Sequence, residues 1–224
     1  MTVTTPKKTL VSEAHARLKS EILSNRMPQG FQATEPEVAM RLGMSRTPVR
    51  EALILLQTEG LVELVPRRGV RVLPISPDDM REIYDILTAL EPEAAAMLAA
   101  QRPTEAELAP LSDATSDMEQ ALDRNDLEVW AEADDRFHRI LIQMSGNNRL
   151  LAIVGTLNDQ AHRARIATLG RRDKPVASTR DHRDILNCLA TGDADRTREA
   201  FRTHRQRAAH ELVEILSNSS ATAG

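Results

Sequence analysis

The sequence contains no apolar run long enough to cross a membrane. No stretch of its 224 residues approaches the roughly twenty consecutive apolar residues that a membrane span needs. The first residues also lack the apolar segment of a secretory signal peptide. We therefore expect a soluble, cytoplasmic protein with no membrane partner.

Cysteine is almost absent. The only one is Cys188, so no disulfide can form within the chain. It lies among Ile185, Leu186 and Leu189 in a helix-like stretch, which predicts a small buried side chain; a redox sensor is the weaker alternative.

The motifs of common enzyme classes are missing as well. No arrangement of a Ser or Cys nucleophile, no phosphate-binding loop and no HExxH string occurs. A metal-dependent hydrolase stays open as an alternative only because the chain carries histidines and carboxylates at ligand-like spacing. We expect a protein that is not an enzyme.

The charges divide the chain into two parts. Residues 1–74 contain eleven Lys and Arg against seven Asp and Glu, whereas the remainder contains eighteen against twenty-six, which together give the net charge of −4. This pattern predicts a basic head that binds nucleic acid and a separate acidic body. We expect a DNA-binding domain at 1–74, a helical domain at 75–218 and a disordered tail at 219–224, with Pro74-Ile75-Ser76-Pro77 as the linker.

Within the head, residues 34–58 have the pattern of a helix-turn-helix. Gly43 supplies the permissive backbone for a sharp turn, and Ser45 is placed to cap the next helix with its side-chain oxygen. Apolar residues at helical spacing face the core and leave Arg46, Thr47 and Arg50 on the outer face of the first turns. A recognition helix presents such side chains to base edges, although a solvated cationic helix end would look similar.

A basic hairpin follows. Strands are expected at 61–65 and 70–73, joined through Pro66, Arg67, Arg68 and Gly69, which suits phosphate or minor-groove contact. An amphipathic helix at 10–22, with Leu10, Ala14, Leu18 and Ile22 on one stripe, should pack beneath this unit. The head is therefore predicted to be a winged helix-turn-helix that binds duplex DNA.

The second part reads as helices with almost no strand signal. The fold class is thus mainly α: a winged helix-turn-helix with a small β wing, followed by an all-α bundle of about six helices. The expected helices cover 77–101, 104–124, 126–145, 149–169, 175–191 and 193–217.

Four polar residues of this bundle fall on apolar helix faces. Asp134 and His138 are one turn apart on an inward face, and His182 and His204 lie on apolar faces of two other helices. An aspartate and three imidazoles pointing into one interior suit a divalent transition metal. Spacing alone leaves open that each histidine is simply buried and hydrogen-bonded to a neighbour.

The head resembles the GntR superfamily of bacterial transcriptional regulators. The similarity is carried by Pro28-Gln29-Gly30, by the string from Ser45 to Leu53, by Glu59-Gly60-Leu61-Val62, and by the string from Pro66 to Val70. This resemblance implies that Arg46, Thr47, Arg50 and the wing residues Arg67, Arg68 and Gly69 contact DNA. The chain departs from some relatives at Pro36, where they carry an arginine.

The second part resembles the FCD-type effector domain that accompanies such heads. The matching strings are residues 134–138, 145–147, 181–186 and 192–193, together with His204. The resemblance implies that Asp134, His138, His182 and His204 hold Zn²⁺ or Ni²⁺ and that a small organic acid coordinates the metal. Leu87 stands where relatives often have an arginine, so His162, Arg163 and Arg165 are the candidates for further effector contacts, with a solvated basic face as the alternative for the two arginines.

Together these patterns predict a homodimeric, ligand-responsive regulator, most simply a repressor, that binds an inverted-repeat operator. A regulator whose metal is purely structural or absent, with an effector that is not a carboxylate, is the alternative.

Overall fold

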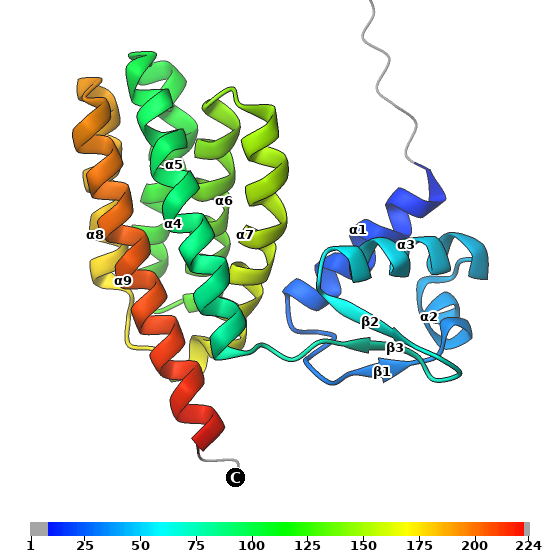
Figure 1. Cartoon of the computed structure of the whole chain (residues 1–224). Helices are drawn as coiled ribbons and strands as arrows, with labels where there is room; N and C mark the ends of the chain where they lie inside the picture. The colour runs from blue at the N-terminus through cyan, green and yellow to red at the C-terminus, as the bar shows by residue number, and fades with distance from the viewer. Residues whose placement is uncertain (1–8, 222–224) are drawn as a thin grey trace, which may run out of the picture. The chain divides into compact units, whose positions relative to one another are not determined.

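The computed structural model describes residues 9–221 (Figure 1). These residues form two compact units, and the division falls between Pro74 and Ile75. Each unit has its own apolar core. Among the described residues, no helix is both long enough and apolar enough to span a membrane.

Three helices build the first unit: α1 (Leu10–Leu23), α2 (Glu35–Leu42) and α3 (Arg46–Thr58). Thr34 and Glu37 form a reciprocal capping box at the start of α2, and Gly43 ends that helix in the left-handed conformation at φ 65°. The turn that Gly43 permits lets α2 and α3 bury their apolar faces together with that of α1. Helices α2 and α3 therefore form the predicted helix-turn-helix, and α1 packs against α3.

A three-stranded antiparallel sheet completes this unit. Strands β2 (Val62–Val65) and β3 (Gly69–Val72) form the wing hairpin, with Val62 opposite Val72. A short strand, β1 (Gln32–Ala33), pairs with the other edge of β3, so the order is β1-β3-β2. Strand β1 was not predicted, because two residues are too few to show an alternating pattern.

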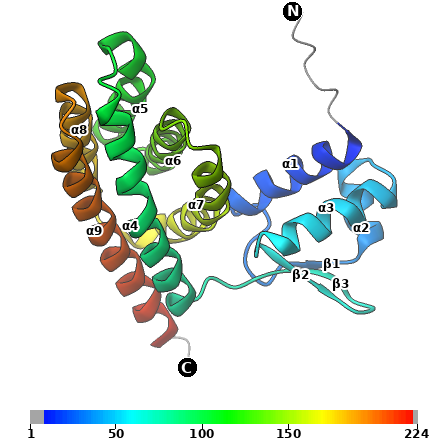
Figure 2. The same ribbon diagram turned by 45° about the horizontal axis from the view of Figure 1, so that its top comes forward.

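The second unit is a bundle of long helices. Helices α4 and α9 run side by side, and α5 packs along α6 (Figures 1 and 2). The helices are α4 (Pro77–Ala100), α5 (Glu105–Asp123), α6 (Leu127–Met144), α7 (Asn148–Thr168), α8 (Val176–Thr191) and α9 (Ala194–Ala221), with a short 3₁₀ turn η1 (Leu169–Arg171) after α7. The predicted fold class is confirmed.

Three local expectations are wrong. Ser45 occupies the N-cap position of α3, but its side chain makes no capping hydrogen bond; its usual donor, the N–H three residues on, is missing because that residue is Pro48. Leu10 is exposed, since it begins α1 and lies beyond the core that its stripe reaches. Helix α9 continues to Ala221, into the expected tail at 219–224, although its last turn is rich in Ser and Asn, which are weak helix formers. Residues 222–224 lie outside the described part.

Candidate functional site

The first turns of α3 present the predicted reading residues to solvent. Arg46, Thr47 and Arg50 are exposed, whereas Pro48 and Val49 between them are buried. The side chain of Arg50 is 68% exposed, and its Nε lies 3.9 Å from Oε1 of Glu35 on α2. The buried side of α3 fixes the helix, so the exposed side offers a cationic, hydrogen-bonding surface of the kind that reads base edges.

The wing tip presents two arginines next to a crowded glycine. Arg67 and Arg68 are exposed, and Arg67 itself has a φ of 64°. Gly69 has a φ of 88°, and a Cβ added there would lie 2.2 Å from the carbonyl oxygen of Ala33. Only glycine lets the hairpin approach this backbone, so Gly69 sets where the two arginines lie.

The bundle brings Asp134, His138, His182 and His204 together from α6, α8 and α9. Oδ1 of Asp134 lies 3.4 Å from Nε2 of His182 and 3.9 Å from Nε2 of His138, and the two imidazole Nε2 atoms are 3.4 Å apart. One nitrogen from each of the three histidines falls within 4.8 Å of the others. All four side chains are buried. We call these residues the histidine cluster.

The outer hydrogen bonds of the rings decide which nitrogens are free. Nδ1 of His182 lies 2.7 Å from the carbonyl oxygen of Ser178. A carbonyl oxygen only accepts, so Nδ1 is the donor and carries the ring proton. Nε2 is then unprotonated, and its lone pair faces the cluster. Nδ1 of His204 lies 3.4 Å from Oδ2 of Asp181. Such outer partners orient imidazoles that ligate metals.

Burial keeps the three imidazoles neutral. It lowers the pKa of His182 to about 3 and lowers the pKa values of His138 and His204, although the nearby carboxylate of Asp181 opposes the shift at His204. Neutral imidazole is the form that binds a metal.

Asp134 stays ionised in this interior. Burial alone would raise its pKa, but the guanidinium of Arg165, with Nε 3.1 Å from Oδ2, lowers it to about 2. Burial likewise acts to lower the pKa of Arg165, yet Asp134 raises it overall. One carboxylate oxygen thus faces the arginine while the other faces the histidines.

The residues of the histidine cluster fit a transition-metal ion. Nε2 of His204 is buried and, within the described part of the chain, has no hydrogen-bond partner. A buried polar atom without a partner is costly, and a cation among three imidazoles and one carboxylate would satisfy it. The donor set of nitrogen with one oxygen suits zinc and its neighbours in the first transition row.

A buried network that the sequence analysis missed supports His138 from behind. Arg205 pairs with Glu91, donates to Oδ1 of Asn158 at 2.9 Å, and lies 3.1 Å from Nδ1 of His138. Asn158 in turn donates to Oε1 of Glu91 at 2.8 Å. A signal existed for both charged residues. Glu91 shares the apolar stripe of Tyr84 and Leu87 on α4, and Arg205 shares the apolar stripe of Phe201 and Leu212 on α9.

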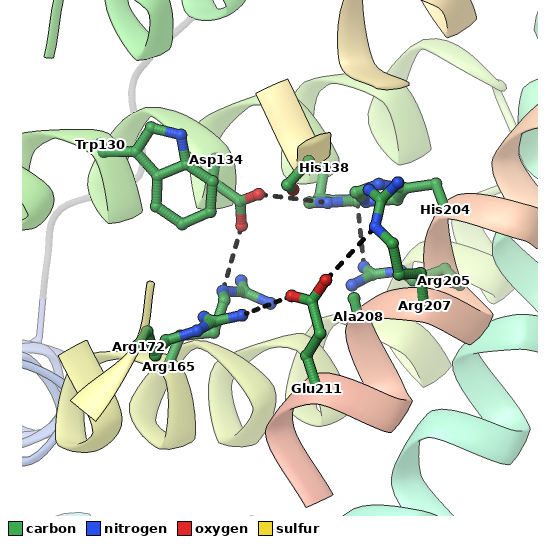
Figure 3. Close-up of a pocket in the computed structure, with 11 residues that line it drawn as sticks. Trp130, Asp134, His138, Arg165, Arg172, His204, Arg205, Arg207, Ala208 and Glu211 are labelled. Atoms are coloured by element: carbon green, nitrogen blue, oxygen red, sulfur yellow. Dashed lines mark hydrogen bonds and ion pairs between the residues drawn. The ribbon is translucent and has the colours of Figure 1, made fainter. Parts of the chain in front are cut away.

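A small cavity opens beside the cluster (Figure 3). Trp130 lies on its wall, and Arg165 points toward Asp134. The other arginines that line it are Arg172, Arg205 and Arg207. Of the three effector candidates, only Arg165 lines this cavity. His162 and Arg163 are buried on α7 and do not line the cavity. Because Arg163 and Arg165 are both buried, neither lies on a solvated basic face, which was the alternative for these two arginines.

Comparison with known proteins decides the family. Residues 10–72 match the model of bacterial regulatory proteins of the gntR family, and residues 82–207, more than half of the chain, match the FCD domain. The chain belongs to the GntR family. It is a DNA-binding transcriptional regulator with an FCD domain, and not an enzyme.

Relatives of this GntR-family regulator span most of its length. The HTH-type transcriptional repressor RspR of Escherichia coli is 30% identical, over 98% of this chain and 97% of its own. An uncharacterized HTH-type regulator in the TAR-I ttuE-ttuC' intergenic region of Agrobacterium vitis is 48% identical, over 59% of this chain and 78% of its own. The structure of E. coli McbR/YncC superposes with a TM-score of 0.81 at 23% identity, covering 93% of this chain and 99% of that one, and thus shares its fold.

Proposed function

We propose that this regulator is a cytoplasmic, homodimeric repressor that binds an inverted-repeat operator and releases it when a small organic acid binds at a metal ion in the bundle. The observation that carries the proposal is the histidine cluster: three neutral imidazoles and one ionised carboxylate converge beside a cavity lined by arginines. A buried donor set of this kind is expensive unless it has a ligand.

Zn²⁺ or Ni²⁺ would be held by Asp134, His138, His182 and His204. When bound, the ion supplies a Lewis-acidic position for a carboxylate oxygen of the effector. Arg165 keeps Asp134 ionised and lines the cavity where that carboxylate would lie. Leu87 is fully buried in the apolar core, so no cation comes from that position.

His138 must change its protonated nitrogen to take part. A guanidinium only donates, so with Arg205 at 3.1 Å the Nδ1 atom accepts and the ring proton lies on Nε2. Coordination through Nε2 requires that proton on Nδ1, where Oε2 of Glu91, 3.9 Å away, is the available acceptor. Glu91 would have to move closer to Nδ1 to act as the carboxylate that orients a metal-bound histidine.

Reading DNA falls to the exposed face of α3 and to the wing. We assign base contacts to Arg46, Thr47 and Arg50, and phosphate or minor-groove contacts to Arg67 and Arg68, with Gly69 shaping the hairpin. One short recognition helix covers only a few base pairs, so two copies related by a twofold axis would read two half-sites. Effector binding would then favour an arrangement of the two heads that fits the operator less well.

The test is selection of bound sequences from a random duplex library, followed by release. We expect an inverted repeat, bound by two chains, that dissociates when an organic acid is added to the metal-loaded protein. A selected site without symmetry, bound by one chain, would contradict the dimer. If the acid releases the operator equally well after EDTA treatment, the effector does not bind at a metal, and a purely structural metal or no metal would be favoured.

A further inference from the structure

A second set of charged side chains lies beside the cavity at the histidine cluster. A more open cavity next to it shares three of its lining residues, Arg172, Ser178 and Glu211. Arg172 follows η1, and Glu211 lies on α9. These two side chains therefore lie at the boundary between the inner and the more open cavity.

Glu211 lies between two arginines. Its Oε2 is 3.5 Å from Nη2 of Arg172, and its Oε1 is 3.4 Å from Nε of Arg207 (Figure 3). Two guanidinium groups thus converge on one carboxylate inside the lining of the cavity.

The burial of the partners is unequal. The side chain of Arg172 is only 7% exposed, whereas that of Glu211 is 41% exposed. Nη1 of Arg172 is buried and, in the part of the chain that the structure describes, makes no hydrogen bond. A buried guanidinium that offers more donors than its carboxylate uses can bind a further anion, and forked donors of this kind match a carboxylate.

The charge of the lining points to the same ligand class. Four arginines line the cavity against two carboxylates, Asp134 and Glu211. The neighbours Glu91 and Asp181 pair with Arg205 and Arg207, which balances the remaining two positive charges. A divalent ion on the histidine cluster would add two positive charges, which a dianion would neutralise.

We infer that the effector carries two anionic groups, one for the metal and Arg165, and a second for a subsite formed by Arg172 and Arg207. Glu211 occupies this subsite when the effector is absent and yields it to the second group. The inference rests on the proposed function, because the first group needs the metal. It narrows the effector class from small carboxylates to dicarboxylates.

The experiment compares acids of matched length on the Zn²⁺-loaded full-length protein. Succinate and butyrate are titrated while the emission of Trp130 is followed; this is the only tryptophan of the chain and lies on the cavity wall. We expect succinate to bind at least about tenfold more tightly, the size of one additional charge-assisted hydrogen bond. Arg172→Gln should remove this preference by weakening succinate alone.

Two further variants test the role of Glu211 and provide a control. Glu211→Gln should strengthen succinate binding, because it removes the competing carboxylate while keeping the shape. Arg202→Gln, on the same helix but outside the cavity lining, should change neither acid. Circular dichroism and metal content confirm that each variant is folded and loaded.

The outcomes separate the two proposals. If both acids bind equally and only in the presence of metal, the second subsite is wrong while the carboxylate sensor stands. If Arg172→Gln weakens butyrate as much as succinate, Arg172 supports the structure and not a subsite. If neither these acids nor longer dicarboxylates bind the loaded protein, both proposals fall.

Discussion

Nδ1 of His182 donates a hydrogen bond to the carbonyl oxygen of Ser178, one turn earlier on α8, at 2.7 Å. The bond fixes the ring and leaves Nε2 with a lone pair 3.4 Å from Oδ1 of Asp134. His182 therefore has the protonation and the orientation of a metal ligand before any metal arrives.

His182→Ala should weaken Zn²⁺ binding by more than the roughly ten- to hundredfold that loss of an outer partner causes, because a ligand itself is removed. Titration calorimetry with a competing chelator measures this. The control is His210→Ala, whose side chain is 83% exposed on α9 and far from any constellation of ligands. Equal metal affinity in the two variants would remove His182 from the site.

Stability of the metal-free bundle should fall with acidification. The folded protein keeps its three buried histidines neutral, whereas the unfolded chain protonates them below about pH 6.5. Unfolding therefore takes up protons as the pH falls, and the free energy of unfolding drops by up to about 4 kcal/mol per pH unit for three groups. Above about pH 7.5 this contribution is constant.

Urea titrations in EDTA, followed by Trp130 emission, check this dependence. Asp134 also lowers the free energy of unfolding as the pH falls, but only between about pH 4 and 2, because its pKa is lowered from 3.8 to about 2. A free energy of unfolding that stays flat from about pH 7.5 to 5 would show that the imidazoles are not buried as neutral groups.

Gly69→Ala should damage the wing and leave the bundle intact. The new Cβ would collide with the carbonyl oxygen of Ala33 and sit in a left-handed backbone conformation. Gly30→Ala is the matched control, because Gly30 has a φ of 78° but nothing within 4 Å of an added Cβ. We expect Gly69→Ala to lose operator affinity, measured by fluorescence anisotropy, much more than Gly30→Ala. Similar losses would mean that the close approach at Ala33 is unimportant.

Arg50→Ala and Arg67→Ala should separate base reading from backbone contact. Removing Arg50 should cost about 1–3 kcal/mol of binding to the selected operator and relax its sequence preference. Arg67→Ala should weaken binding to all DNA sequences alike. It should also reduce the slope of the logarithm of the binding constant against the logarithm of the salt concentration by about one. Binding measured against operator and scrambled duplex at several salt concentrations distinguishes the two, and unchanged operator affinity in Arg50→Ala would refute this docking.

Arg205→Met should destabilise the bundle by about 3–5 kcal/mol, because it leaves Glu91 as an unpaired buried charge. The double variant Glu91→Leu with Arg205→Met should recover much of that loss. Urea unfolding followed by Trp130 emission reports on both. A double variant less stable than the single one would show that the pair itself, and not the orphaned charge, dominates.

Periodicity predicted most of the helices, and the resemblance to FCD-type domains predicted the members of the histidine cluster. The turn at Gly43 and the apolar periodicity of the long helices mark boundaries that the structure reproduces to within a residue or two in most cases. The pairing of Asp134 with His138 was readable because both residues lie on one helix, one turn apart.

What could not be predicted depends on which helices meet. Arg205 and Glu91 are far apart in sequence and come together only where α4 and α9 pack side by side. The same holds for Arg172 and Glu211, since a loop and a helix bring them to one cavity. The capping failure at Ser45 shows the reverse case, where a single neighbouring proline overrides a strong local preference.

The most direct test of a metal-assisted sensor is the melting temperature of the purified full-length protein. It is measured as isolated, after EDTA, and after reloading with Zn²⁺ or Ni²⁺, each with and without succinate. A ligand at one hundred times its dissociation constant adds about 2.7 kcal/mol, which moves a melt by several degrees. We predict a rise with metal and a further rise with succinate that disappears in EDTA. A melt that neither metal nor acid changes would contradict a metal-assisted sensor in this bundle.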